Sequence, residues 1–362
     1  MRHQDLLRHY HAARPALQER AEHLRESLAA WLADDASIKV HSVTARLKAP
    51  ESLALKLERP DKSYDDLWDI TDLVGLRVIT YFEDAVDRVG QVLEARLPID
   101  FQESTDKRRR RDESAFGYRS LHYVFRLGGE LPARARAEVQ VRTVLEHAWA
   151  EIEHDLGYKA REAMPASARR RLSRVAGLLE LADQEFVAIR RELEAYASVL
   201  PARVANDDDA LPLDRLSLTT LLACDDVRDL DVRIAGALGK PLGDKPFFVE
   251  YLLKMLAAGG VRTVAEARSG LREHGARIEA MVGPYFAFAS RTWSLSAEQM
   301  ETVYRGYSLF FLAHVTALRA SSLGIDKVER LAHLYREMDY PDDARAAQRV
   351  ASLLVEAFGD VA

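Results

Sequence analysis

Three polar side chains in the segment AEVQVRT have the spacing of one face of a β-strand. Glu138, Gln140 and Arg142 alternate with small or branched apolar residues, and successive side chains of a strand point to opposite faces of its sheet. Because a carboxylate, an amide and a guanidinium are costly to bury together, we expect this face to line a solvent-filled cleft. A carboxylate in such a cleft can bind a divalent cation or accept a proton from a hydroxyl group.

The segments on either side of this strand add further polar groups. In SLHYVFRL the apolar residues alternate with Ser120 and His122, which predicts a second half-buried strand. The segment VLEHAWAEIEHDLGYK has helical spacing. It places four side chains on one side of a helix: His147, Glu151, His154 and Tyr158. Two strands and a helix are therefore expected to bring their polar faces together.

A set of phosphate-type donors lies earlier in the chain, with the spacing R-x-K-x3-S-x3-K. Arg46 and Lys48 share a strand face, and Ser52 and Lys56 are four residues apart on the following helix. If these donors converge, they can grip a triphosphate; a solvated surface is the alternative. The sequence contains neither of the common glycine-rich phosphate-binding motifs, so side chains would have to hold the phosphates.

Asp72 stands just before a β-rich run that contains Arg77. Together with Glu138 on a neighbouring strand it can hold Mg²⁺ with the help of phosphate oxygens, whereas taken alone it reads as a turn or cap residue. His147, Glu151 and His154 match half of a di-iron pattern, but no second Glu-x-x-His completes it, so a structural histidine cluster is favoured.

Five consecutive cations, 107–111, precede the second strand. A solvated loop explains them on composition alone. Their position beside the predicted site also suits phosphate contacts, with Arg109 and Arg110 as the candidates.

Length and composition indicate a two-domain protein without a membrane segment. The chain has 362 residues, 48% of them hydrophobic and 30% charged, and a net charge of −6, so it can bury full cores and has no global nucleic-acid footprint. A single cysteine, Cys224, excludes an intrachain disulfide or a thiolate metal site. The charged N-terminus and the lack of a long apolar run predict a cytoplasmic location.

The hydrophobic patterns predict an α+β domain followed by an all-α one. The expected elements of the first domain are a helix at 4–32, a strand at 38–48, a helix at 50–57, strands at 76–82 and in the central stretch, and helices at 85–97 and 166–198. The polar segment 201–212 reads as the linker, which predicts domains at 1–200 and 213–362. The second domain is expected to end in helices at 297–318, 326–337 and 342–358.

Five linked motifs resemble a known family. The strings RLKAPESLALK, DITDLVGLRVITYF, FGYRSLH, AEVQVRT and HAWAEIEHDLGYK resemble, in the same order, the synthetase domain of the RelA/SpoT alarmone synthetases, particularly the small single-synthetase members. The resemblance covers about residues 35–160. It implies a mixed β-sheet flanked by helices, related to nucleotidyltransferases. It also implies a GTP pyrophosphokinase, which transfers the β,γ-pyrophosphate of ATP to the ribose 3′-hydroxyl of GDP or GTP to make (p)ppGpp.

The resemblance assigns ATP-binding roles to the donors described above. Arg46 and Arg77 would sandwich the adenine, while Lys48, Ser52 and Lys56 would hold the phosphates.

On the other side of the reaction, Asp72 and Glu138 would bind Mg²⁺, and Glu138 would also act as the base on the 3′-hydroxyl. Tyr118 would stack on the acceptor's base. The remaining acceptor-side residues implied by the family are His122, Gln140 and Arg142.

Three departures from the family pattern bear on function. Ser114 and Phe116 occupy places where many members carry Lys and Asn, so the acceptor's phosphates would fall to 107–111, or the acceptor differs. Only about forty residues precede the synthetase motifs, too few for the family's hydrolase domain, so we expect synthesis without degradation. The region after 212 matches none of the family's ribosome-sensing domains.

Two alternatives to (p)ppGpp synthesis therefore stay open. The chain resembles equally the toxic branch that pyrophosphorylates the 3′ CCA end of tRNA, with the C-terminal domain as its regulator or a regulator's binding site; another purine nucleotide is a further acceptor. The other alternative is a catalytically inert nucleotide-binding module. The oligomeric state is open, a homo-oligomer included. The aromatics of the second domain, between 285 and 311, are expected to form its core.

Overall fold

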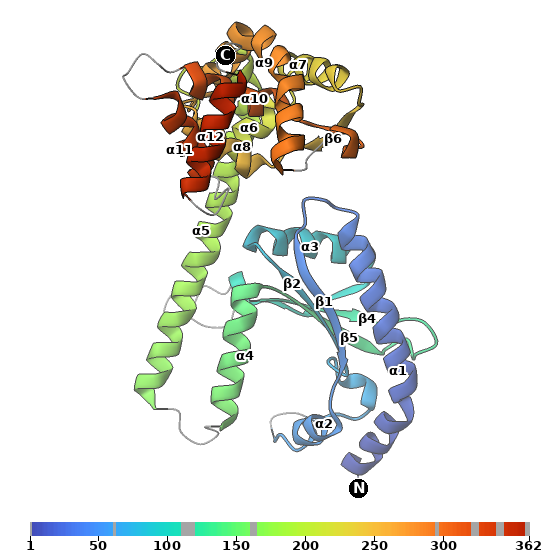
Figure 1. The fold of residues 1–362 in the computed structure, drawn as a ribbon. Helices are drawn as coiled ribbons and strands as arrows, with labels where there is room; N and C mark the ends of the chain where they lie inside the picture. The colour runs from blue at the N-terminus through green and yellow to red at the C-terminus, as the bar shows by residue number, and fades with distance from the viewer. Residues whose placement is uncertain are drawn as a thin grey trace. The chain divides into compact units, whose positions relative to one another are not determined.

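The boundary between the two units of this chain falls inside one long helix. In the computed structural model, which describes residues 2–60, 63–109, 120–159, 165–293, 297–319, 326–337 and 344–358, unit 1 is Met1–Glu192 and unit 2 is Leu193–Ala362. Figure 1 shows the elements of both. The α+β class with a helical C-terminal region is confirmed.

Unit 1 is built on a five-stranded mixed sheet with the order β1-β2-β5-β4-β3. The β2 and β5 strands are parallel, and every other neighbouring pair is antiparallel. The strands are β1 (Val40–Leu47), β2 (Val74–Thr80), β3 (Ile99–Asp106), β4 (Leu121–Arg126) and β5 (Arg136–Thr143). The two segments with alternating apolar residues, which the sequence predicts to be strands, are β4 and β5, and they pair with each other.

One face of this sheet is packed and the other is polar. Apolar residues of helices α1 (Arg2–Ala33) and α3 (Glu83–Arg96) pack against the first face. The strands contribute Leu121 and Phe125 from β4 and Val139 from β5 to this core. On the other side lie α2 (Pro50–Leu57) and α4 (Val144–Lys159). Two short 3₁₀ turns, η1 (Leu67–Asp69) and η2 (Lys107–Arg109), complete the unit.

The β3 strand is the element of unit 1 that the sequence does not predict. Its segment is mostly polar and lacks the period-2 alternation, and it pairs with β4 only near its ends, with a register shift between Asp100 and Thr105. Since an edge strand needs only one partner and little burial, its sequence carries a weak signal.

The predicted linker at 201–212 begins too early. Helix α5 (Ala166–Ala205) runs through Pro201, although an interior proline costs about 3 kcal/mol. Leu200 and Val204 are 1% and 0% exposed in the core of unit 2, and burying two such side chains offsets that cost. The helix ends where Asp207 adopts a positive φ of 50°, and helix α6 starts at Arg215.

Unit 2 is helical with one small sheet. Two strands, β6 (Leu242–Pro246) and β7 (Val303–Arg305), pair in parallel, so the helix predicted at 297–318 is wrong in its first part. The helices are α6 (Arg215–Leu221), α7 (Asp225–Ala237), α8 (Val249–Ala258), α9 (Val264–Trp293), α10 (Tyr307–Arg319), α11 (Lys327–Glu337) and α12 (Ala344–Phe358), with a 3₁₀ turn η3 (Ala297–Gln299). As predicted, the aromatics of α9 and α10 form the core, with Tyr285, Phe310 and Phe311 in mutual edge-to-face contact.

Within the described residues, no helix is long and apolar enough to cross a membrane.

Candidate active site

Two rows of polar residues cross the open face of the unit 1 sheet. In the first row, Arg46 of β1 lies opposite Gly75 of β2, which lies opposite Glu138 of β5. Gly75 has no side chain, and a Cβ atom there would be in ordinary van der Waals contact with the Arg46 side chain, at 3.7 Å.

The second row is parallel to the first, two residues further along β5. Arg77 of β2 is aligned with Gln140 of β5, and Gln140 is paired with His122 of β4. Residues that are opposite each other in a sheet share a face, so strand register alone brings these groups together.

The two rows and the α2 helix enclose a cleft of about 700 Å³. This size is within the range of pockets for small ligands. Nine residues singled out in the sequence line it: Arg46, Lys48, Ser52, Lys56, Asp72, Arg77, Glu138, Gln140 and His154. The four donors of the R-x-K-x3-S-x3-K motif thus share one wall, because Pro50 starts the helix directly after β1 and Lys56 lies in its last turn.

Asp72 is held by both lysines of that motif. Lys48 Nζ donates to Asp72 Oδ2 at 2.7 Å, and Lys56 Nζ donates to Asp72 Oδ1 at 2.8 Å. Burial alone would raise the pKa of Asp72, but the hydrogen bonds and charges of the lysines outweigh it, so the pKa lies below its usual range. Asp72 is therefore an ionised carboxylate with an ammonium group on each oxygen.

Glu138 is the second carboxylate of the cleft. Its Oε1 lies 2.8 Å from His122 Nδ1 and accepts a hydrogen bond of 2.6 Å from Gln140 Nε2. Burial raises the pKa of Glu138, as does the charge of Asp72, but the contacts with His122 and Gln140 lower it further, and the net shift is downward. Both carboxylates are thus charged at neutral pH, which is the state that binds a divalent cation.

Helix α4 is tied to the sheet through Arg77. The Arg77 guanidinium lies 3.0 Å from Glu151 Oε1, and His147 Nδ1 lies 3.6 Å from the same oxygen. His154 lines the cleft from the same helix. The described residues contain no cluster of three or more His, Cys, Asp or Glu suited to a metal.

Arg142 lies deeper than the sequence suggests. Its side chain is buried, with 2% of the residue exposed, and its Nη2 donates to Gln140 Oε1 at 3.2 Å. Arg142, Gln140, Glu138 and His122 therefore form one hydrogen-bonded chain along the cleft floor, in which Arg142 orients Gln140.

Several predicted acceptor-side residues lie outside the described part of the chain. Arg110, Tyr118, Ser114 and Phe116 are not among the described residues. The backbone of Arg109 ends η2, but its side chain is not described either.

Two polar residues that line the cleft were not found by the sequence analysis. Arg59 follows α2 by two residues, and Thr44 faces the cleft from β1. Each continues the spacing of residues already singled out, since Thr44 is two before Arg46 on the strand and Arg59 is three after Lys56. Extending the two periods by one step would have found both.

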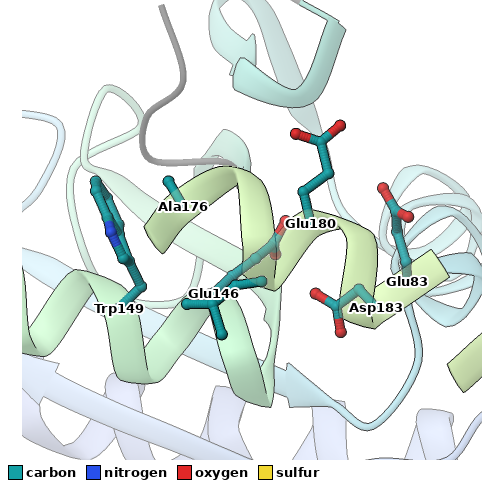
Figure 2. A pocket seen from close by; sticks show the side chains of 7 residues that line it. Glu83, Glu146, Trp149, Ala176, Glu180 and Asp183 are labelled. Atoms are coloured by element: carbon teal, nitrogen blue, oxygen red, sulfur yellow. The ribbon is translucent and has the colours of Figure 1, made fainter. Parts of the chain in front are cut away.

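A second, much smaller cavity lies between α4 and α5. Its volume is about 20 Å³, too small for more than a water-sized group. Figure 2 shows Trp149 of α4 beside Ala176 of α5, with carboxylates of Glu83, Glu180 and Asp183 around the opening. Since Asp183 already accepts a hydrogen bond of 2.7 Å from Thr143 Oγ1, this cavity belongs to the packing of α5.

The segment that forms the cleft matches a known protein family. Residues 45–163, from within β1 to just after α4, match the family model RelA_SpoT, described as a region found in RelA / SpoT proteins. Residues 45–163 therefore form a RelA/SpoT region, and the resemblance inferred from the motifs is confirmed.

Among curated relatives, GTP pyrophosphokinase YjbM of Bacillus subtilis (strain 168) is 29% identical over 186 residues, which are 50% of this chain and 86% of that protein. GTP pyrophosphokinase YwaC of the same organism is 26% identical over 161 residues, 43% of this chain and 76% of that one. A solved structure of small alarmone synthetase 1 from Bacillus subtilis bound to its product pppGpp is 28% identical, covers 49% of this chain and 93% of that chain, and has a TM-score of 0.43.

Proposed function

We propose that this chain is a GTP pyrophosphokinase that transfers the β,γ-pyrophosphate of ATP to the ribose 3′-hydroxyl of GDP or GTP. The observation that carries the proposal is that two ionised carboxylates, Asp72 and Glu138, share one cleft with the cations of β1 and α2. The curated relatives named above, both GTP pyrophosphokinases, support the same reaction.

ATP would occupy the wall formed by β1 and α2. Arg46 and Arg77 present two guanidinium planes on adjacent strands, which suits stacking on both sides of adenine. Lys48, Ser52 and Lys56 then face the phosphates. Both lysines are bonded to Asp72, so they would turn from that carboxylate to the phosphate oxygens when ATP binds.

The same movement prepares the metal site. Asp72 and Glu138 fit Mg²⁺, which is usually bound by one or two carboxylates together with substrate phosphates. When bound, the cation would neutralise charge on the β- and γ-phosphates during transfer. Among the described residues that line the cleft, Asp72 and Glu138 are the carboxylates that would hold the cation, and phosphate oxygens and water would complete its coordination.

The transfer itself needs positioning and one proton acceptor. The acceptor's 3′-oxygen attacks the β-phosphorus, a new oxygen–phosphorus bond forms, and the bond from the β-phosphorus to the bridging oxygen of AMP breaks. Glu138 would take the proton of the 3′-hydroxyl, since its carboxylate is ionised and oriented by His122 and Gln140. No covalent enzyme intermediate is required.

The test is direct. The purified chain is incubated with Mg²⁺, γ-³²P-labelled ATP and, in separate reactions, GDP, GTP, another purine nucleotide or deacylated tRNA, with Glu138→Gln as the control. We expect label in a guanosine tetra- or pentaphosphate. Label in tRNA alone would assign the chain to the tRNA-modifying branch, and no transfer to any acceptor would leave a nucleotide-binding module.

A further inference from the structure

The carboxylate of Glu151 on helix α4 contacts one of the two arginines proposed for adenine. Its Oε1 lies 3.0 Å from Arg77 Nη1, in an ion pair that leaves 20% of the Arg77 side chain and 56% of the Glu151 side chain exposed. Arg77 and Arg46 both line the cleft. Among the described residues, however, Arg46 has no ion-pair partner. The two arginines are therefore held in different ways.

Two matching lengths of chain bring Glu151 beside Arg77. The β2 and β5 strands are parallel, with Thr80 opposite Thr143, and α4 starts at Val144. Arg77 lies three residues before Thr80, or about 10 Å along the strand, and Glu151 lies seven residues into the helix, also about 10 Å. Because α4 folds back along β2, the two side chains reach the same level, as their ion pair shows.

The first two turns of α4 are anchored, so Glu151 extends from a fixed support. Thr143 N donates to Glu146 Oε2 at 2.9 Å, and Glu146 N donates to Thr143 Oγ1 at 3.1 Å, which is the reciprocal arrangement of a capping box. Further along, Trp149 Nε1 donates to the carbonyl oxygen of Leu172 on α5 at 3.3 Å. A carboxylate on a helix held in this way can hold another side chain in a defined position.

The neighbouring histidine does not take the place of Arg77 as the charged partner of Glu151. His147 Nδ1 lies 3.6 Å from the same Oε1, which is beyond hydrogen-bond distance. Burial lowers the pKa of His147, and the charges of Arg142 and Arg77 lower it further against the opposing effect of Glu151. Because the imidazole is neutral at physiological pH, the charge of Glu151 is paired with Arg77.

From these contacts we propose that Glu151 is a positioning residue for ATP: it holds the Arg77 guanidinium in place for stacking on adenine, without touching the nucleotide itself. An arginine that is already held loses less conformational freedom when a ligand binds, so the ligand binds more tightly. The inference rests on the proposed function, because the adenine role of Arg77 belongs to it.

Calorimetric titration of the full chain measures this role without turnover. The ligand is the Mg²⁺ complex of an ATP analogue with a methylene bridge between the α- and β-phosphates, where the proposed transfer breaks a bond. Glu151→Gln keeps the size of the side chain and removes its charge. It should raise the dissociation constant about fivefold, since partly exposed ion pairs contribute modestly. The matched control, Glu153→Gln, is exposed on another side of the same helix and should leave the constant unchanged.

The direction of the change separates positioning from a simple charge effect. The nucleotide is an anion, so removing a carboxylate that acts only through its charge would leave binding unchanged or tighten it; either result would overturn the proposal. Tripolyphosphate is the second ligand, because it has the phosphates of ATP but no base. Its dissociation constant should not rise in Glu151→Gln. Equal weakening of both ligands would show a general distortion of the cleft and would also contradict the positioning role.

A double-mutant cycle shows whether Glu151 acts through Arg77. In an Arg77→Ala background, Glu151→Gln should cause no further loss of affinity for the analogue, whereas in an Arg46→Ala background it should keep its full effect. Equal effects in the two backgrounds would rule out the positioning role. If Arg77→Ala weakens binding and Glu151→Gln does not, that role alone fails. If Arg77→Ala has no effect, the adenine assignment of the proposed function fails with it.

Discussion

Asp72 in the cleft of unit 1 and Asp231 in the core of unit 2 are both withdrawn from solvent, yet their pKa values move in opposite directions. For Asp72, burial is outweighed by two lysines, and the pKa falls. For Asp231, which is fully buried, burial outweighs the hydrogen bonds from the backbone N–H groups of Gly306 at 2.6 Å and Ser308 at 2.8 Å, and the pKa rises. A charged partner preserves a buried charge, and neutral partners do not.

The histidine of the unit 2 core follows the same rule. His314 is buried among aromatic rings, its Nδ1 lies 2.9 Å from the Phe310 carbonyl oxygen and its Nε2 lies 3.1 Å from the Tyr335 hydroxyl. Burial lowers its pKa to about 4.

These differences separate charges kept for chemistry from polar groups kept for folding. The cleft holds ion pairs between Asp72 and both Lys48 and Lys56, and in the proposed function the two lysines would exchange Asp72 for phosphate. The core of unit 2 holds polar groups with internal partners, such as Asp231, which satisfies N–H groups at the start of α10. Substitutions in the cleft should therefore change turnover and metal binding, whereas substitutions in the core of unit 2 should change the free energy of unfolding.

The largest effect is expected at Glu138. Glu138→Gln keeps the size of the side chain but removes the charge, so turnover should fall by about 10²–10⁴-fold with little change in thermal stability. Glu153→Gln, an exposed position on α4, is the control and should retain activity. Turnover within threefold of the parent chain in Glu138→Gln would remove Glu138 from the reaction and break the contrast between the regions.

Next in size is the loss of core packing in unit 2. Phe311 is fully buried, whereas Phe248 is 71% exposed. Phe311→Ala should lower the free energy of unfolding of unit 2 by about 3–5 kcal/mol, and Phe248→Ala should change it by less than about 1 kcal/mol. Denaturant unfolding followed by tryptophan fluorescence measures both. Similar losses in the two variants would mean that α10 is not the centre of this core.

The pH dependence of stability should distinguish the regions through His314. Its pKa is about 4 in the folded chain and about 6.5 when unfolded, so the unfolded state binds more protons between these values. The contribution of neutral His314 to the free energy of unfolding is therefore fully present above pH 6.5. It falls by about 3 kcal/mol as the pH decreases towards 4.

The pH effect is measured as the difference between the parent chain and His314→Gln across pH 4–8. The difference curve should be flat above pH 7 and slope below 6.5. The lowered pKa values of Asp72 and Glu138 act only at lower pH, since such carboxylates lose their stabilising effect as the pH falls below the ordinary carboxyl range. A flat difference curve throughout would show that His314 does not stay neutral in the core.

The smallest effect concerns metal affinity in the cleft. With Lys48 and Lys56 on both oxygens of Asp72, the nucleotide-free chain should bind Mn²⁺ weakly, and a non-hydrolysable ATP analogue should tighten binding at least about tenfold, or about 1.4 kcal/mol. Electron paramagnetic resonance of free Mn²⁺ measures both states. Lys56→Met should strengthen metal binding without nucleotide, and Lys39→Met, an exposed site, should not. Equal affinity with and without nucleotide would refute the exchange of partners.

Much of the unit 1 fold is readable from local patterns. The alternation in β4 and β5, the proline at the start of α2 and the helical spacing of α1 and α3 all come from periods of 2 or 3.6 residues that a short window contains. The mostly polar edge strand β3 and the short pair β6 and β7 have no such period, so they were missed. The passage of α5 through Pro201 was also hidden, because it depends on burial in unit 2.

The candidate site also has features that the sequence predicts and features that only the structure shows. The motif spacing identified Arg46, Lys48, Ser52, Lys56 and Glu138 as cleft residues, while the roles assigned to them remain predictions until tested. The burial of Arg142 and the bonding of both lysines to one carboxylate were not readable, since neither is a property of a single segment.

The sequence by itself determined which side chains share the face of a strand or helix, because backbone periodicity is local. Only the tertiary structure decided that β2 and β5 lie side by side, that Asp72 is neutralised by two lysines and that Asp231 is not. Strand order and burial depend on contacts between distant segments, and the charge state of a buried group depends on which partners those contacts bring to it.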